Sequence, residues 1–339
     1  MRAVLARAAV ALALVAAATG CWPSGSSPPV SAARGCRPGT IERADARIDR
    51  IVSADARIEC LADGYSWVEG PVWDRAGRAL LFSDIPANAI YRWRPGEGVR
   101  VHIERSGYTG ETRFDGREPG SNGLAFDREG RLVVCQHGDR RVVRIESDGT
   151  RTTLADRYEG KRLNSPNDVV VASDGTLYFT DPPFGLPETF GDPARELDFC
   201  GVYRLPPGGP LELVTRELEA PNGIALSPDE RTLYVANARH ERPVVVAYTL
   251  GSDGAVGSGR TLFDFTPWQR EGRGTPDGMA VDRQGSLFVA GPGGVHVIGL
   301  DGIRLGMIGI NAATSNCAWG EDETVLYVTA DDAVYRVEL

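Results

Sequence analysis

Short stretches in which hydrophobic and polar residues alternate recur along the chain from about residue 56 to the C-terminus. They are rich in valine, leucine and tyrosine and lie between Asp-Gly, Glu-Gly or similar turns, as in Arg131–Cys135 (RLVVC) and Thr232–Ala236 (TLYVA). This period-two alternation is typical of antiparallel β-strands. No amphipathic helical pattern is longer than two turns. The pattern therefore predicts an all-β protein.

The strands belong to a unit that occurs six times. Each copy opens with an acidic residue or an asparagine, at Glu69, Asn122, Asn167, Asn222, Asp277 and Asn316. The copies begin 39 to 55 residues apart, a length that suits the four-stranded blade of a β-propeller. The last copy stops after its third strand, and residues 56–61, ahead of the first copy, form a strand candidate that could complete it. We predict a six-bladed β-propeller over residues 56–339, with four-stranded antiparallel blades around a central metal-binding channel.

The N-terminus has the layout of an export signal. Arg2 and Arg7 precede an uninterrupted apolar run over residues 8–18, and small residues then lead to Cys21. This predicts a signal peptide over residues 1–20. Because Ala-Thr-Gly before Cys21 resembles a bacterial lipobox, we expect an exported protein of the cell envelope or periplasm that is lipid-anchored at Cys21. A linker and N-terminal arm would span residues 21–55, and plain cleavage without lipid is the alternative.

The net charge and the cysteines limit the classes of partner and of cysteine site that the sequence allows. A formal net charge of −9 disfavours nucleic acid and anionic membranes. No apolar run after residue 20 approaches the ~20 residues that span a bilayer, so the lipidated N-terminus is the only membrane contact we expect. The later cysteines show neither CxxC nor zinc-ligand spacing and do not support a catalytic cysteine. Cys36 and Cys60 both precede the first repeat and are the expected disulfide pair.

The six repeat positions form a candidate ligand ring. In a propeller the inner strands start on one face around the channel, so equivalent residues point at the axis. All six are oxygen donors, which suit Ca²⁺ or Mg²⁺ better than zinc. Alternatively, Asn-Gly and Asp-Gly are only turn formers. However, no glycine follows Asn167 or Asn316, and Glu69 is a poor turn residue. We expect at least three of the six to bind one divalent ion.

Several motifs together resemble the SMP-30/regucalcin/gluconolactonase family of six-bladed propellers, over residues 58–339. They are Glu69–Trp73 (EGPVW), Asn164–Asp168 (NSPND), Phe179–Gly185 (FTDPPFG), Pro221–Gly223 (PNG) and Pro276–Met279 (PDGM). Three more are similar to the bacterial gluconolactonase branch: Gly107–Gly110 (GYTG), Glu118–Gly123 (EPGSNG) and Gln136–Asp139 (QHGD). The resemblance implies hydrolysis of a sugar lactone to the aldonic acid. It places the family's metal ligands at Glu69, Asn167, Asn222 and Asp277. Animal members bind substrate through an arginine where this chain has Ser165, so the resemblance does not specify the sugar.

The resemblance also implies a mechanism. A divalent ion, with Ca²⁺ favoured and Zn²⁺, Mg²⁺ or Mn²⁺ as alternatives, would polarise the lactone carbonyl and stabilise the oxyanion formed when water attacks. Asp277 is the family's proposed general base. Since a metal-bound carboxylate is a weak base, metal-bound hydroxide is an equal alternative. Asn122 and Asn316 are expected to line the channel within hydrogen-bonding reach of substrate or water.

Other residues are candidates for contacts with the sugar. His137 follows the second strand of blade two, and Tyr108 and Arg117 lie in a long insert of blade one that could cover the pocket. Asp84 and Asp181 end second strands and are expected to cap loops or support ligands. No serine-hydrolase elbow, H-E-x-x-H, P-loop or dinucleotide fingerprint is present in the sequence.

Two other functions stay open. One is a noncatalytic propeller with a structural metal that binds a ligand or a protein. The other is a paraoxonase-like lactonase or esterase. Oxygen donors in all six repeats favour an enzyme, because an interaction propeller has no need of them. The oligomeric state is not predicted.

Overall fold

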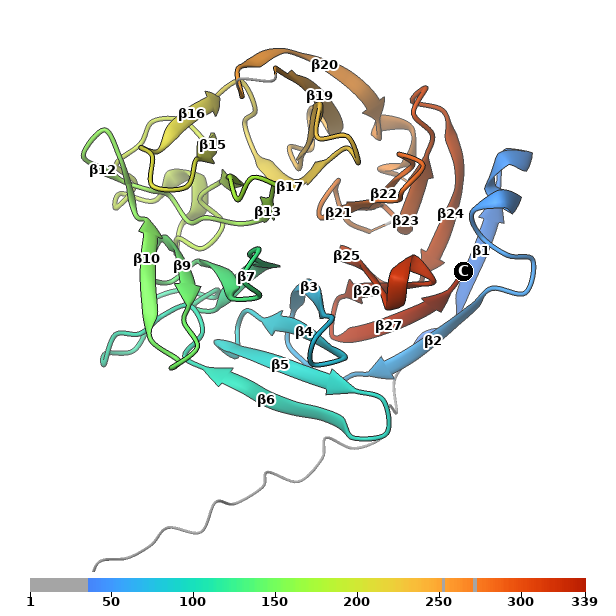
Figure 1. Ribbon diagram of the computed structural model, residues 1–339, viewed down its shortest axis with the longest axis horizontal. Helices are drawn as coiled ribbons and strands as arrows, with labels where there is room; N and C mark the ends of the chain where they lie inside the picture. The colour runs from blue at the N-terminus through green and yellow to red at the C-terminus, as the bar shows by residue number, and fades with distance from the viewer. Residues whose placement is uncertain (1–35, 252–253, 271–272) are drawn as a thin grey trace, which may run out of the picture.

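The six repeats fold into six antiparallel sheets arranged in a ring around a central axis (Figure 1). This computed structural model describes residues 36–251, 254–270 and 273–339. The predicted six-bladed propeller is confirmed, whereas the expected signal peptide and Cys21 lie outside the described residues. Within the described ranges, no helix is long and apolar enough to cross a membrane. Helical structure there is limited to short 3-10 turns: η1 (Ala46–Arg50), η2 (Thr189–Gly191), η3 (Thr266–Trp268) and η4 (Glu321–Glu323).

In blades one to four the first strand along the chain lies at the centre, and the following strands lie progressively farther out (Figure 1). Blades five and six have the same order, except that an N-terminal strand is added at the outer edge of each. Blade one contains β3 (Val68–Asp74), β4 (Ala79–Asp84), β5 (Ala89–Arg94) and β6 (Gly98–Glu104). Blade two contains β7 (Ser121–Phe126), β8 (Leu132–Gln136), β9 (Arg141–Ile145) and β10 (Arg151–Ala155). Blade three contains β13 (Val169–Val171), β14 (Leu177–Asp181), β15 (Gly201–Leu205) and β16 (Glu212–Thr215).

The remaining blades follow the same order. Blade four contains β17 (Pro221–Leu226), β18 (Thr232–Asn237), β19 (Val244–Leu250) and β20 (Val256–Asp264). Blade five contains β21 (Met279–Val281), β22 (Leu287–Gly291), β23 (Gly294–Ile298) and β24 (Arg304–Ile310). Blade six contains β25 (Thr314–Gly320), β26 (Val325–Ala330) and β27 (Ala333–Glu338), with β2 (Arg57–Ala62) as its outer strand. A small hairpin of β11 (Arg157–Tyr158) and β12 (Lys161–Arg162) lies between blades two and three.

The N-terminal strand β2 closes the ring, as predicted. It pairs with β27 in a register that sets Arg57 opposite Glu338 and Ile58 opposite Val337. The expected disulfide between Cys36 and Cys60 is present, with the two Cα atoms 5.9 Å apart. An additional strand, β1 (Gly39–Arg43), pairs with β24 and gives blade five a fifth strand. The N-terminal arm is therefore attached to two neighbouring blades.

The core consists of apolar clusters between neighbouring blades. Between blades two and three, for example, Cys135 and Val142 pack against Phe179 and Tyr203. Equivalent clusters lie at the other five blade interfaces. Each blade thus buries both of its faces, which explains why strands such as β26 are buried at every residue. Burial of apolar area at all these interfaces stabilises the ring.

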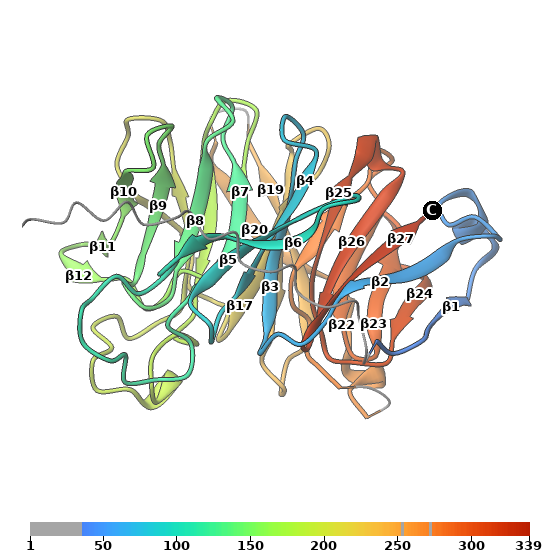
Figure 2. The same ribbon diagram turned by 90° about the horizontal axis from the view of Figure 1, so that it is seen from below.

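Two long connections gather on one face of the molecule (Figure 2). Residues 105–120 join β6 to β7, and residues 182–200 join β14 to β15. Because the first connection leads into an inner strand and the second leaves an adjacent antiparallel strand, both lie on the face where inner strands begin. They border the same entrance to the channel.

Candidate functional site at the propeller axis

The six repeat positions lie where the inner strands meet. Around the ring, β3, β7, β13, β17, β21 and β25 contact one another in order, and β25 returns to β3. Five of the six repeat residues are buried, and Asp277 keeps some accessible surface while its Oδ1 is buried. Glu69, Asn122, Asn222 and Asn316 lie within strands rather than in turns. Turn formation therefore does not explain why these residue types recur.

Hydrogen bonds between blades fix the backbone of the ring. The Ser83 hydroxyl of blade one donates to the Asn122 carbonyl of blade two at 2.9 Å. In the same way, Thr180 of blade three donates to the Asn222 carbonyl of blade four at 2.7 Å. Register shifts follow at the start of β3, β7 and β17, where bulges redirect side chains. The ring residues thus project from a backbone that neighbouring blades hold in place.

Close packing explains the glycines that follow most ring residues. A Cβ on Gly70 would lie 2.1 Å from the Asn122 carbonyl oxygen, and one on Gly223 would lie 2.1 Å from that of Asp277. Neither position can accept a side chain without moving the neighbouring inner strand. The recurring glycine therefore brings the ring residues of adjacent blades together.

Three carboxylates from different blades influence one another at the axis. Burial raises the pKa of Glu69 to about 8, with a further contribution from the charge of Asp168. Burial also raises the pKa of Asp168 to about 6. The pKa of Asp277 is raised by burial and then by the charges of Glu69 and Asp168. The Asn316 side chain lowers the pKa of both Glu69 and Asp168 and so offsets part of these rises, which connects blade six to this cluster.

Sequence reasoning did not identify Asp168 as a site residue. It stands directly after Asn167, where four of the other copies have glycine. Its Oδ1 accepts from the Val169 amide at 2.9 Å, and its Oδ2 accepts from the Ile224 amide of blade four at 3.2 Å. The sequence offered one signal for Asp168: in this copy alone, an acidic residue follows the ring residue.

The residues at the axis fit a hard divalent cation. Their donors are carboxylate and amide oxygens, the ligand type that Ca²⁺ and Mg²⁺ prefer. Asp277 Oδ1 is buried and has no hydrogen-bond partner among the described residues. Three mutually repelling acids would be stabilised by a positive charge. No group of three or more His, Cys, Asp and Glu residues in the described ranges has the spacing of a metal site by itself. A cation would therefore need the amide oxygens of Asn167 and Asn222 as well.

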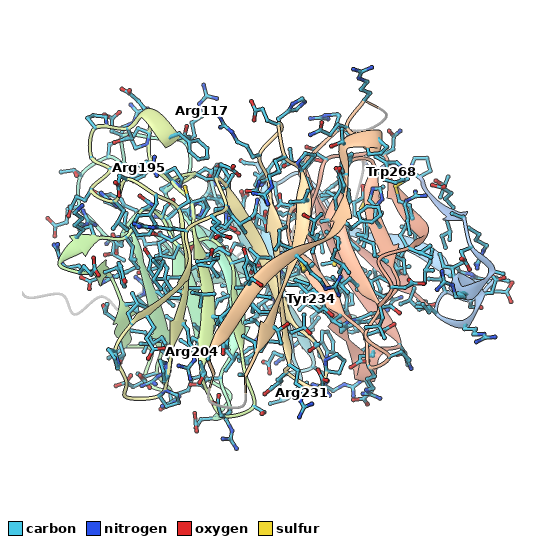
Figure 3. The ribbon with its side chains drawn as sticks, turned by 90° about the horizontal axis from the view of Figure 1, so that it is seen from above. Arg117, Arg195, Arg204, Arg231, Tyr234 and Trp268 are labelled. Atoms are coloured by element: carbon cyan, nitrogen blue, oxygen red, sulfur yellow. A yellow bond between two sulfur atoms is a disulfide. The ribbon has the colours of Figure 1, made fainter. Side chains whose placement is uncertain are left out.

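The predicted sugar-contacting residues separate into two groups. His137 is fully buried, and its Nε2 lies 3.4 Å from Nδ2 of the ring residue Asn122. Arg117 lies exposed at the surface (Figure 3). The Tyr108 hydroxyl bonds to Thr112 Oγ1 at 2.8 Å within the same insert. The structure brings His137 to the ring, but it does not bring Arg117 or the Tyr108 hydroxyl there.

The acids that end second strands cap loops, as predicted. Asp84 accepts from the amides of Ser66 and Trp67 at 3.1 and 3.2 Å. Asp181 accepts from the Asn164 amide at 2.8 Å, and burial raises the pKa of Asp181 to about 7. Both residues hold the segments that lead into inner strands.

Ser165 has a comparable role. Its hydroxyl donates to the Pro182 carbonyl at 2.7 Å and accepts from the Gly185 amide at 2.9 Å. It thereby fixes the start of the connection after β14.

Comparison with known proteins agrees with this architecture. Residues 67–332 match the family model described as SMP-30/Gluconolactonase/LRE-like region. A gluconolactonase from Zymomonas mobilis is 39% identical over 307 residues, which cover 88% of this chain and 86% of that protein. A regucalcin from Xenopus laevis is 27% identical over 284 residues, covering 81% and 86%. The structure of a gluconolactonase from Xanthomonas campestris has a TM-score of 0.77 at 35% identity and covers 94% of this chain and 100% of its own. The chain therefore belongs to the SMP-30/gluconolactonase family.

Proposed function

We propose that this protein is a hydrolase that opens a sugar lactone related to gluconolactone to the aldonic acid, with the help of one divalent metal ion. The observation that carries the proposal is the meeting of Glu69, Asp168 and Asp277 at the axis. Burial raises the pKa of all three, and the charge of Asp168 raises the pKa of Glu69 and Asp277 further. Buried acids with perturbed pKa values are typical of catalytic centres. Gluconolactonases among the relatives support the same class of reaction.

Four residues would hold the ion: Glu69, Asn167, Asn222 and Asp277. Their all-oxygen donor set favours Ca²⁺, and the two carboxylates would balance its charge. When bound, the ion would supply Lewis acidity toward the lactone carbonyl. Asn167 and Asn222 would contribute neutral donors, while the Asn316 amide favours the ionised forms of Glu69 and Asp168 by lowering their pKa.

Asp277 is the proposed general base. Its buried Oδ1 has no hydrogen-bond partner among the described residues, so it would be free to accept a proton from a bound water molecule. That water would lose a proton to Asp277 and add its oxygen to the carbonyl carbon. The ester C–O bond of the ring would then break, and the released ring oxygen would take up the proton. Asn122 and Asn316 would contact the hydroxyl groups of the sugar.

A panel of lactones tests this function. Protein treated with EDTA should be inactive, and activity toward gluconolactone should return when Ca²⁺, Zn²⁺, Mg²⁺ or Mn²⁺ is restored separately. Metal binding without hydrolysis of any lactone would instead support a noncatalytic propeller with a structural metal. Faster hydrolysis of aryl esters than of sugar lactones would support a paraoxonase-like esterase.

A further inference from the structure

Three side chains form a line from the channel entrance to the ring. Glu118, whose side chain is 33% exposed, has its Oε2 3.0 Å from Nδ1 of the fully buried His137. On the other side of the imidazole, Nε2 lies 3.4 Å from Nδ2 of Asn122. The contact with Glu118 is electrostatic rather than a straight hydrogen bond, and Nδ1 has no hydrogen-bond partner in the part of the chain that the structure describes.

Hydrogen-bond chemistry determines which nitrogen of His137 carries the proton and which way the Asn122 amide is turned. An ionised carboxylate can only accept, so Glu118 favours the imidazole tautomer with its proton on Nδ1. Nε2 is then an acceptor and requires the NH₂ group of Asn122, because the amide oxygen would face a lone pair. Asn122 Oδ1 is consequently turned away from the histidine. It is buried and has no partner among the described residues.

We propose that Glu118, acting through His137, orients the Asn122 amide so that Oδ1 accepts a hydrogen bond from a hydroxyl group of the substrate. This inference rests on the proposed function and names the residues that would distinguish a hydroxylated lactone from an unsubstituted one. An unsubstituted lactone carries no donor for Oδ1, so a buried acceptor stays unpaired when it binds. Glu118 and His137 are positioning residues in this arrangement, and Asn122 is the substrate contact.

Packing on both sides holds the line in place. Asp139, two residues after His137, accepts from the Thr109 amide at 3.1 Å and from its hydroxyl at 2.6 Å. These bonds attach the insert that carries Glu118 to the turn that carries His137. From the connection after β14, Gly185 packs so closely that a Cβ there would lie 2.5 Å from His137 Cβ. The imidazole is therefore fixed before any ligand arrives, as a specificity element requires.

The imidazole tautomer can be measured without an activity assay. In ¹⁵N-histidine-labelled protein, the His137 signals are assigned by substituting the other three histidines one at a time. We expect Nδ1 to be protonated and Nε2 bare. Glu118→Leu should remove this preference, whereas Glu111→Leu, at an exposed acid of the same insert, should not. A proton on Nε2 in the wild-type protein would overturn the proposal.

Kinetics then test the role in specificity. Glucono-1,5-lactone and δ-valerolactone share the six-membered lactone ring, but only the first carries hydroxyl groups. Loss of one neutral hydrogen bond should lower the ratio of their kcat/KM values about 3- to 10-fold in Glu118→Leu, mainly through KM. Asn122→Ala should lower this ratio at least as much, and adding Glu118→Leu to it should cause no further loss. Glu111→Leu is the matched control, with an unchanged ratio.

Two results would contradict the proposal in different ways. An unchanged ratio of kcat/KM values in Glu118→Leu would show that Glu118 and His137 do not help the enzyme to distinguish hydroxylated from unsubstituted lactones. An equal fall for both lactones, with weaker metal binding, would place Asn122 at the reaction centre instead. If wild-type protein supplied with metal hydrolyses neither lactone, the proposed function fails, and the tautomer measurement alone decides whether Glu118 orients His137.

Discussion

At the scale of single residues, Glu69 and Asp277 differ from the four asparagines of the ring in their charge. Either can neutralise a cation, but only Asp277 combines a buried, unpartnered oxygen with some accessible surface. Asp277→Asn keeps the shape and one oxygen donor while it removes basicity. With metal at saturation, we expect kcat on gluconolactone to fall about 10²- to 10⁴-fold, the usual effect of losing a general base. Near-normal hydrolysis by the metal-saturated variant would exclude Asp277 as the base.

Glu69→Gln is the matched variant, because Glu69 is proposed to bind the metal without acting as the base. In the wild-type protein the Glu69 carboxylate accepts from the Gly70 amide at 3.0 Å, and the charge of Asp168 raises its pKa. Loss of its charge should weaken metal affinity, so activity should fall at low metal concentration and return largely as metal is added. Titration of activity against metal, followed for both variants, separates the two roles. A Glu69→Gln enzyme that excess metal cannot restore would point to a direct role in proton transfer.

Repetition determines which site residues a sequence can reveal. The six ring positions were identified because each copy places a polar oxygen at the same point, and the propeller carries all six to one axis. Asp168 stands one position after the ring residue of its copy, and Glu118 lies in a connection between blades, outside the repeated strands. Their importance depends on contacts between blades, such as Asp168 with Ile224, which no local spacing encodes.

At the scale of strands, the disulfide between Cys36 and Cys60 ties the N-terminal arm to the strand that closes the ring. It encloses a loop with a sequence separation of 24 residues, so chain-entropy arguments assign it about 2–4 kcal/mol of stability. Replacing both cysteines by serine should lower the free energy of unfolding in urea by that amount. Reductant should shift the wild-type transition similarly and leave the double variant unchanged. Equal midpoints for all samples would show that the bond contributes nothing to stability.

In the same N-terminal arm, the sequence pattern predicted one of the two strands and missed the other. The closing strand β2 was expected, because the sixth repeat lacked a partner and residues 56–61 alternate. The strand β1 was not expected, because it has no counterpart in the repeats and is only partly buried at the edge of blade five. An edge strand of this kind is defined by the backbone groups that β24 offers, and these do not appear in the sequence of the strand itself.

At the scale of the whole molecule, the buried acids link metal binding to stability. Without a metal, burial raises the pKa of Glu69 to about 8 and that of Asp168 to about 6, both above the ordinary values of about 4. The folded state therefore holds protons that the unfolded chain releases, and stability falls as pH rises from about 4 to about 8. We expect the Tm of EDTA-treated protein to fall over this range and saturating Ca²⁺ to abolish most of the fall. Glu69→Gln should flatten the metal-free curve, and a metal-free Tm independent of pH would contradict this coupling.

We propose that the whole molecule is exported and attached to the cell envelope through Cys21, with the segment up to about residue 35 as a linker. Intact mass of the mature protein should show a diacylated or triacylated cysteine at its N-terminus. Cys21→Ser should release the protein from membranes without changing its lactone hydrolysis. An unmodified N-terminus at another residue would exclude the lipid anchor while leaving export open.

The pairing of β2 with β27 also sets the order of events during folding. These strands are separated by nearly the whole chain, so the ring cannot close until the last residues have been synthesised. Until then β2 lacks the strand with which it pairs, and each newly completed blade presents an uncovered apolar face to solvent. Contacts of such long range slow folding, and exposed strand edges favour association with other chains. A chain that stops before residue 333 should consequently accumulate as an open arc that aggregates or is degraded, however complete its first five blades are.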